Sequence, residues 1–153
     1  MRSKFLLDIL EDAARAPGLV GIGEDAYVRP NELADPALEP VRFETFVSDF
    51  ATRPDAEESA VTVCSGGIIV SGPRGEGIER VDAIAQALAD LFAPYGAFGA
   101  RGWTFQEPLF GTSARRVSRV YAAGVERSNG TVVDGRYKVK ITVALEIFEE
   151  KTL

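Results

Sequence analysis

Few residues of this chain have side chains suited to acid–base or nucleophilic chemistry. Histidine is absent from all 153 residues, and cysteine occurs once, at Cys64. The chain therefore lacks the usual general base at neutral pH and the partner that activates a serine or cysteine nucleophile. A single thiol forms neither an internal disulfide nor a zinc site. The aliphatic neighbours of Cys64 predict a structural thiol on a partly buried strand, with a reactive nucleophile as the alternative.

Pairs of adjacent carboxylates, such as Glu11–Asp12, Glu57–Glu58 and Glu149–Glu150, are candidates for acid–base chemistry. An acid–base dyad needs burial or close coupling to separate its two pKa values. These pairs fall on an expected helix surface, in an expected loop and near the C-terminus. We interpret them as solvated carboxylates, and we predict no catalytic residue and no enzymatic activity.

A glycine-rich segment, Gly72–Gly77, lies between an expected strand and an expected helix, where glycines expose backbone N–H groups to a phosphate. Its spacing matches neither G-x-G-x-x-G nor the Walker pattern, no Lys-Ser/Thr follows, and Glu76 would repel an anion. We interpret the segment as a plain turn, and we expect no cofactor and no metal. A small ligand-binding or enzymatic domain that uses this turn is the alternative from a different functional class.

The charge of the chain argues against a nucleic-acid partner. It has 17 basic and 23 acidic side chains and a net charge of −6, so a phosphate backbone repels the molecule as a whole. We expect no specific nucleic-acid binding. Asp8 interrupts the apolar run that follows Arg2 and Lys4, and no other stretch has the length of a membrane span. We therefore expect a cytoplasmic protein that is not secreted and has no membrane partner.

Hydrophobic spacing predicts a single α+β domain over residues 1–153. An N-terminal helix is expected over 1–17, an extended connection over 18–40, and a sheet with a central helix over 41–148. Strands are expected at 41–50, through 61–70 with a bend at Gly66-Gly67, at 117–125 and at 137–147, and the central helix at 77–92. Whether the segment around Gly66-Gly67 is one strand or two stays open. The expected architecture is an antiparallel or mixed sheet with two main helices packed on one face.

The two clearest patterns in the chain predict a packing contact. Alternating apolar residues run from Tyr137 to Ile147, and an apolar stripe at helical spacing runs through 77–92. We expect the odd-numbered residues of that strand to pack against the helix. We also expect the strand to pair with 117–125 as a long hairpin.

Two charged groups are candidates for contact with another subunit. The first is an expected loop that contains Arg53, Asp55, Glu57 and Glu58. The second is the one local basic cluster, which consists of Arg115, Arg116 and Arg119. Arginines at 115 and 119 share a strand face if the strand begins there, and an ordinary solvated edge is the alternative. Trp103, Phe105 and Phe110 are interpreted as core side chains, with docking on a partner as the alternative.

The segment from Ile68 through the Gly72–Gly77 turn to Phe92 resembles small phage tail-completion proteins of the tail-terminator class. The resemblance extends to the strand Gly135–Leu145 and to an N-terminal helix followed by a proline-containing segment. It implies an α+β fold without catalytic residues. It also implies a homo-oligomeric ring, usually of six subunits, that caps the tail tube and joins it to the head–tail connector.

The same resemblance implies three partners: further copies of the chain, a tail-tube protein and a head–tail connector protein. The implied location is the virion tail, after assembly in the host cytoplasm. Residues 18–40 and the acidic loop 55–58 have no counterpart in that class. A head-completion or connector protein is therefore the alternative among virion components.

Overall fold

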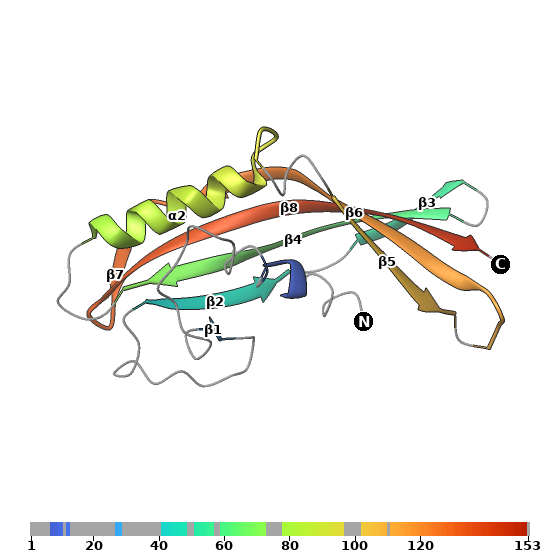
Figure 1. The fold of residues 1–153 in the computed structure, drawn as a ribbon, viewed down its shortest axis with the longest axis horizontal. Helices are drawn as coiled ribbons and strands as arrows, with labels where there is room; N and C mark the ends of the chain where they lie inside the picture. The colour runs from blue at the N-terminus through green and yellow to red at the C-terminus, as the bar shows by residue number, and fades with distance from the viewer. Residues whose placement is uncertain are drawn as a thin grey trace.

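A computed structural model describes residues 7–10, 12, 27–28, 41–48, 51–56, 59–72, 78–96, 102–109 and 111–152. This part of the chain forms one eight-stranded sheet and one long helix (Figure 1). In chain order the elements are β1 (Tyr27–Val28), β2 (Arg42–Val47), β3 (Ala51–Ala56), β4 (Ser59–Ser71), α2 (Glu79–Phe92), β5 (Trp103–Pro108), β6 (Arg115–Arg127), β7 (Thr131–Val133) and β8 (Arg136–Thr152).

The sheet is built around β8, which lies between β4 and β6. The strand order is β1-β2-β4-β8-β6-β5, with β3 beside the first part of β4 and β7 beside the start of β8. The antiparallel pairing of β6 with β8 confirms the predicted pairing of the last two long segments. The short strand β7 lies between them in the chain, which turns back at Asp134 and Gly135, both with positive φ.

Strand β4 runs unbroken through Gly66 and Gly67, so this segment is one strand. A Cβ atom at Gly67 would collide with the backbone oxygen of Ile141 on β8 and with the Phe46 ring. A Cβ atom at Gly66 would lie 2.9 Å from the backbone oxygen of Phe46. These two glycines therefore let neighbouring backbone and side chains approach β4 closely, and they do not end the strand.

Helix α2 and the first two-thirds of β8 form the main core, and the predicted packing between them is confirmed. Odd-numbered residues of β8 are buried from Val139 to Ile147, and the buried stripe of the helix faces them; its members are Val81, Ile84, Ala85, Leu88, Ala89 and Phe92. Each large aliphatic or aromatic side chain buried here stabilises the fold by about 1.5–3 kcal/mol.

The expected α+β class with two main helices on one face is wrong, because the described residues form a curled, mainly antiparallel sheet with one long helix. Strand β3 occupies a segment interpreted as a charged loop, and β5 occupies a segment where no strand was expected. Both strands are held by pairing with β4 and β6, whose own apolar patterns define the sheet. Long-range pairing therefore outweighed the low strand propensity of residues such as Pro54 and Asp55.

Of the helix expected over 1–17, residues 7–10 and 12 are helical, with Ile9 and Leu10 buried in the core, and the rest lies outside the described residues. Of the connection expected over 18–40, only β1 is described. In the part of the chain that the structure describes, no helix has both the length and the apolar character needed to span a membrane.

The helix is much shorter than the strands beneath it. With 14 residues, α2 spans about 21 Å, whereas the 17 residues of β8 span about 55 Å. The helix therefore covers one half of the sheet, and the strands continue past it (Figure 1).

Candidate protein–protein interface

The half of the sheet beyond α2, here called the distal sheet, is the candidate functional surface. It consists of β3, β5, the start of β4, the start of β6 and the end of β8, and it lies at the opposite end of the molecule from β7 (Figure 1). Its register aligns Val61, Phe148 and Arg119 on one row and Thr62, Ile147 and Val120 on the next. Because side chains alternate along each strand, neighbouring rows present opposite faces.

The inner face of the distal sheet, which continues the face packed against α2, carries buried polar side chains. Glu107 and Glu149 are only 5% and 6% exposed. Arg116 on β6 pairs with Glu107 on β5, with its Nε donating over 2.7 Å. The hydroxyl of Thr62 donates to Glu149 over 3.4 Å, and it also bonds to Thr52 on β3 over 2.8 Å. Each buried carboxylate therefore has a polar partner on a neighbouring strand.

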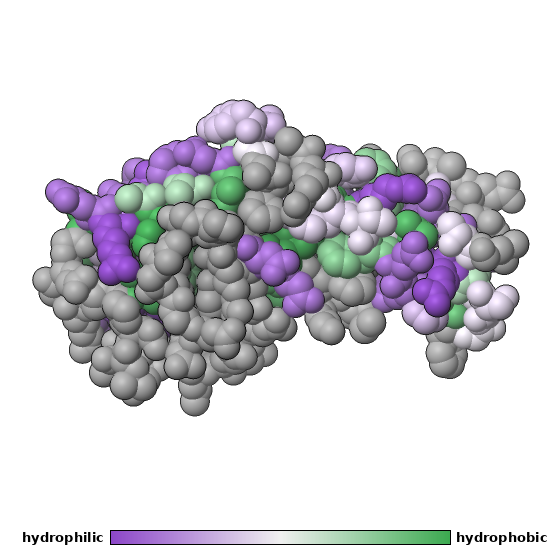
Figure 2. Space-filling view, viewed as in Figure 1, coloured by the Kyte–Doolittle hydropathy of each residue, from purple (hydrophilic) through white to green (hydrophobic). Residues whose placement is uncertain are grey.

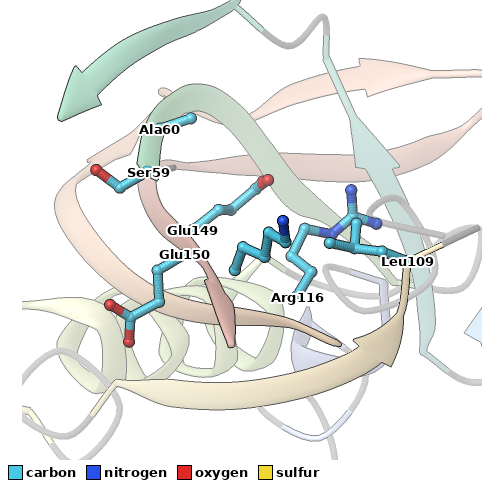
Figure 3. A pocket seen from close by; sticks show the side chains of 7 residues that line it. Ser59, Ala60, Leu109, Arg116, Glu149 and Glu150 are labelled. Carbon is cyan, nitrogen blue, oxygen red and sulfur yellow. The ribbon is translucent and has the colours of Figure 1, made fainter. Parts of the chain in front are cut away.

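A cavity of about 230 Å³ lies beside these residues. It is lined by Ser59, Ala60, Leu109, Arg116, Glu149, Glu150 and Lys151. Figure 3 shows that the side chains of Glu149 and Glu150 leave β8 in different directions. The expectation of a solvated pair is therefore wrong for Glu149. The reason is that β8 continues to Thr152, so two adjacent carboxylates must lie on opposite faces of the sheet.

The outer face of the distal sheet carries an exposed apolar cluster, here called the aromatic patch: Val63, Tyr121 and Phe148. These side chains are 45%, 43% and 38% exposed. The rings of Tyr121 and Phe148 pack edge to face with their centroids 5.9 Å apart. Beside them, Arg119 on β6 pairs with Glu150 on β8 over 3.0 Å. Figure 2 shows hydrophobic and hydrophilic side chains intermixed at this end of the molecule.

The structure places five of the seven predicted interface residues, all on two strands of the distal sheet. Arg115, Arg116 and Arg119 lie on β6, but only Arg115 and Arg119 point outward, since Arg116 turns inward to Glu107. Arg53 and Asp55 belong to β3, which β4 and β8 separate from β6 by about 14 Å. Glu57 and Glu58 lie outside the described residues.

The aromatic patch was missed in the sequence, although one signal for it was present. On the polar face of β8, Lys138, Lys140 and Glu146 are followed by Phe148, which breaks the alternation at an outward position. Tyr121 and Val63 both stand opposite Glu146 in the register of the sheet. Only the pairing of β4 and β6 with β8 shows that these apolar residues lie on one face of the distal sheet, around Glu146.

The structure also locates the thiol, the aromatic residues and part of the glycine-rich turn that the sequence analysis considered. Cys64 is half-buried beside the core, and burial raises the pKa of its thiol to about 11, which disfavours the nucleophilic thiolate. Trp103 and Phe105 are half-buried and pack against the core, as the core interpretation predicts, and Phe110 lies outside the described residues. Of the turn Gly72–Gly77, the structure describes Gly72, whose N–H donates to the Tyr137 carbonyl over 3.1 Å.

Within the described residues, no three Cys, Asp or Glu side chains are grouped so that they could hold a metal ion. Tyr95 and Tyr137 have raised pKa values because their hydroxyl groups donate to carboxylates, Asp90 and Asp82 respectively. The first contact joins α2 to the turn that follows it, and the second joins α2 to β8. Both lie away from the cavity of the distal sheet.

No family model and no curated protein matches this chain. Eleven chains of solved structures do match it. One of them has a TM-score of 0.53 and 15% sequence identity, over 95% of this chain and 92% of that chain, and its name describes no function. At this identity the similarity concerns the fold alone.

Proposed function

We propose that this protein is a structural assembly protein of the phage tail-terminator class. In this proposal, copies of the chain form a ring of six subunits that caps the tail tube and joins it to the head–tail connector. The observation that carries the proposal is the distal sheet, where the strands continue past the helix and expose the aromatic patch. Clustered exposed aromatic side chains are typical of protein contact surfaces.

The residues that resemble the tail-terminator class form a connected part of the fold. Residues 68–92 supply the end of β4 and all of α2, and residues 135–145 supply most of the covered part of β8. These elements pack on one another in the core. They support the proposal because the residues that resemble the tail-terminator class form one scaffold. The distal sheet extends from that scaffold as the part available to partners.

The polar groups of the distal sheet favour binding over catalysis. Arg116 neutralises Glu107, Thr62 donates to Glu149, and Arg119 pairs with Glu150. Charged groups that pair with one another in this way are occupied, and the outer face presents the Arg119–Glu150 pair beside the aromatic patch. Such a surface suits association with other subunits and with the tail-tube and connector proteins, in the virion tail.

Deletion of the gene from the phage, followed by electron microscopy of the particles, tests the proposal. We expect tails of irregular, excessive length or tails that are not joined to heads, and rescue when the wild-type chain is supplied in trans. Tails of normal, uniform length joined to heads would contradict the proposal. Tails of uniform length that lack heads would instead favour a head-completion or connector protein.

A matched pair of variants connects the phenotype to the distal sheet. Phe148→Glu places a charge in the aromatic patch, whereas Lys140→Glu changes an exposed side chain on the same face of β8, outside the patch. We expect the Lys140 variant to rescue the deletion and the Phe148 variant to fail. Before the rescue experiment, circular dichroism establishes that both variants fold.

A further inference from the structure

We propose that Asn129 is a site of spontaneous modification, where the side-chain amide is lost and an aspartate or an isoaspartate forms. The inference is independent of the proposed function, because it rests on the chemistry of one dipeptide and on the place of that dipeptide in the sheet. Asn129 is followed by Gly130. Because glycine has no side chain to hinder its backbone nitrogen, that nitrogen can attack the side-chain amide of a preceding asparagine.

The reaction needs water as its only co-reactant. The backbone nitrogen of Gly130 loses its proton and forms a bond to Cγ of Asn129, and the bond from Cγ to the amide nitrogen breaks. Ammonia leaves, and a five-membered succinimide ring remains. Water then opens the ring at one of its two carbonyl carbons. Addition at Cγ gives aspartate, whereas addition at the main-chain carbonyl gives isoaspartate, in which the main chain runs through the former side chain.

The dipeptide Asn129–Gly130 forms a bulge where the chain passes from β6 into β7. Before the dipeptide, the N–H group of Ser128 donates to the carbonyl group of Lys140 on β8 over 2.9 Å. After it, Thr131 pairs with Lys138 of the same strand. Two residues therefore stand opposite a single residue of β8, and such a bulge interrupts the ladder of backbone hydrogen bonds.

The bulge leaves Asn129 accessible to water and able to rotate. Its side chain is exposed. Within the described part of the chain, neither Asn129 nor Gly130 forms a hydrogen bond. The reaction requires rotation about the Cα–C bond of Asn129, which brings the nitrogen of Gly130 up to the side chain. This rotation therefore breaks no hydrogen bond of the dipeptide itself.

The packing around the bulge requires glycine at position 130. A Cβ atom on Gly130 would collide with the ring and the hydroxyl oxygen of Tyr137. That hydroxyl donates to Asp82 in the first turn of α2 over 2.9 Å, so the ring cannot move aside without loss of this contact. A larger residue at 130, which would hinder attack on Asn129, would therefore disturb the joint between β8 and the helix.

A similar dipeptide, Asp134–Gly135, closes the turn between β7 and β8, but its geometry disfavours the reaction. Its residues have φ angles of 53° and 77°, as in a two-residue type I′ turn. In this left-handed conformation the backbone nitrogen of the next residue lies on the far side of the Cα–C bond from the side chain. Asn129 has a negative φ, because Asp134 is the only non-glycine residue with positive φ in the described part of the chain.

Incubation of the folded protein at mildly alkaline pH, beside the same protein in denaturant, tests the site. Trypsin then releases residues 128–136 as one peptide, in which Asn129 is the only amide side chain. Loss of ammonia from Asn129 is therefore measured as a mass increase of this peptide. We expect the folded protein to react at no less than about a tenth of the rate of the denatured chain, because exposed segments open at little cost in free energy. A slower reaction in the folded protein would show that the sheet protects Asn129 and would overturn the inference.

The products test the route of the reaction. Fragmentation of the peptide by electron transfer distinguishes isoaspartate from aspartate at position 129. We expect both products, because water can open the succinimide at either carbonyl. Aspartate alone would show direct hydrolysis of the side-chain amide and would rule out attack by the nitrogen of Gly130.

The variant Asp134→Asn tests the role of the backbone, because it gives the turn the same dipeptide as the bulge. Asparagine followed by glycine suits a type I′ turn, and circular dichroism establishes that the variant folds. We expect Asn129 to react at least about fivefold faster than the substituted position, because the turn must open before its backbone nitrogen can reach the side chain. A smaller difference, or a faster reaction in the turn, would contradict the assignment of reactivity to the bulge.

Discussion

The hydroxyl group of Tyr137 donates a hydrogen bond to the carboxylate of Asp82 over 2.9 Å, and so joins the start of β8 to the first turn of α2. Arg127 at the end of β6 donates to the same carboxylate oxygen over 2.6 Å. Helix α2 has no side-chain hydrogen bond at its N-cap residue, Ile78. The contacts of Asp82 therefore fix the start of the helix against two strands.

Replacement of Tyr137 by Phe removes one of these contacts and keeps the ring. We expect the free energy of unfolding to fall by about 1 kcal/mol, the usual contribution of one hydrogen bond. Chemical denaturation at neutral pH measures this change. Tyr95→Phe is the control, because Tyr95 is 80% exposed and its hydrogen bond joins α2 only to the turn that follows it. Equal stability of the two variants would contradict this role of Tyr137.

The hydrogen bond from Tyr137 to Asp82 predicts that the stability of the protein depends on pH in the alkaline range. The hydrogen bond to Asp82 raises the pKa of Tyr137 above 10.0, because ionisation of the phenol would end the donation and place two negative charges together. Its contribution is therefore complete below pH 10 and is lost as pH rises through the folded-state pKa. We expect wild-type stability to fall more steeply above pH 10 than that of Tyr137→Phe. Parallel curves would contradict the assignment.

The two arginine–glutamate pairs of the distal sheet should differ greatly in their contributions to stability. Glu107 keeps only 7% of its side chain exposed, so Arg116→Met leaves a buried carboxylate without its ionic partner and should cost about 3 kcal/mol. Arg119 and Glu150 are 48% and 44% exposed, so Arg119→Met should cost about 0.5 kcal/mol or less. Urea denaturation of both variants measures the difference, and similar losses would contradict the burial of Glu107.

Two glycines on either side of β8, Gly67 in β4 and Gly124 in β6, should differ in their response to alanine. A methyl group at Gly67 collides with the backbone of β8, so Gly67→Ala should destabilise the domain by about 3 kcal/mol. At Gly124 in β6 no atom lies within 4 Å of the added carbon, so Gly124→Ala should change stability by less than about 1 kcal/mol. Thermal unfolding of the pair tests the close approach of β4 to β8. Equal melting temperatures would argue against it.

Adjacent residues of β8 should tolerate a charge very differently. Val143 is completely buried under α2. Val143→Asp should unfold the domain, because an unpaired buried carboxylate costs several kcal/mol and the total free energy of unfolding is only about 5–15 kcal/mol. Ala144 faces solvent, and Ala144→Asp should leave the protein folded. Circular dichroism distinguishes the two outcomes. A folded, soluble Val143→Asp protein would overturn the placement of the helix.

The core could be predicted because its signals are local. The alternation from Tyr137 to Ile147 and the helical stripe through Leu88 each specify one buried face without reference to the rest of the chain. Strands β3 and β5 could not be predicted in this way. Pro54 and Asp55 resemble a loop, and β5 follows a glycine-rich stretch, so both strands depend on the partners beside them.

The distal sheet could be predicted only in part for a related reason. The arginines at 115, 116 and 119 were found from their clustering, but the inward turn of Arg116 depends on Glu107 across the sheet. Phe148, Tyr121 and Val63 belong to three strands, and their position on one face follows from a register that no local pattern encodes. Glu149 was misinterpreted because the strand was expected to end before it.

The central position of β8 has a consequence for the order in which the protein folds. Among the described strands β8 is synthesised last, yet it separates β4 from β6, and its pairing joins Ser59 to Glu150. The two halves of the sheet therefore stay apart on the ribosome until β8 emerges, with one edge each of β4 and β6 open in the meantime. Contacts between residues so distant in sequence form slowly, so the nascent chain should depend on protection from aggregation until synthesis of β8 is complete.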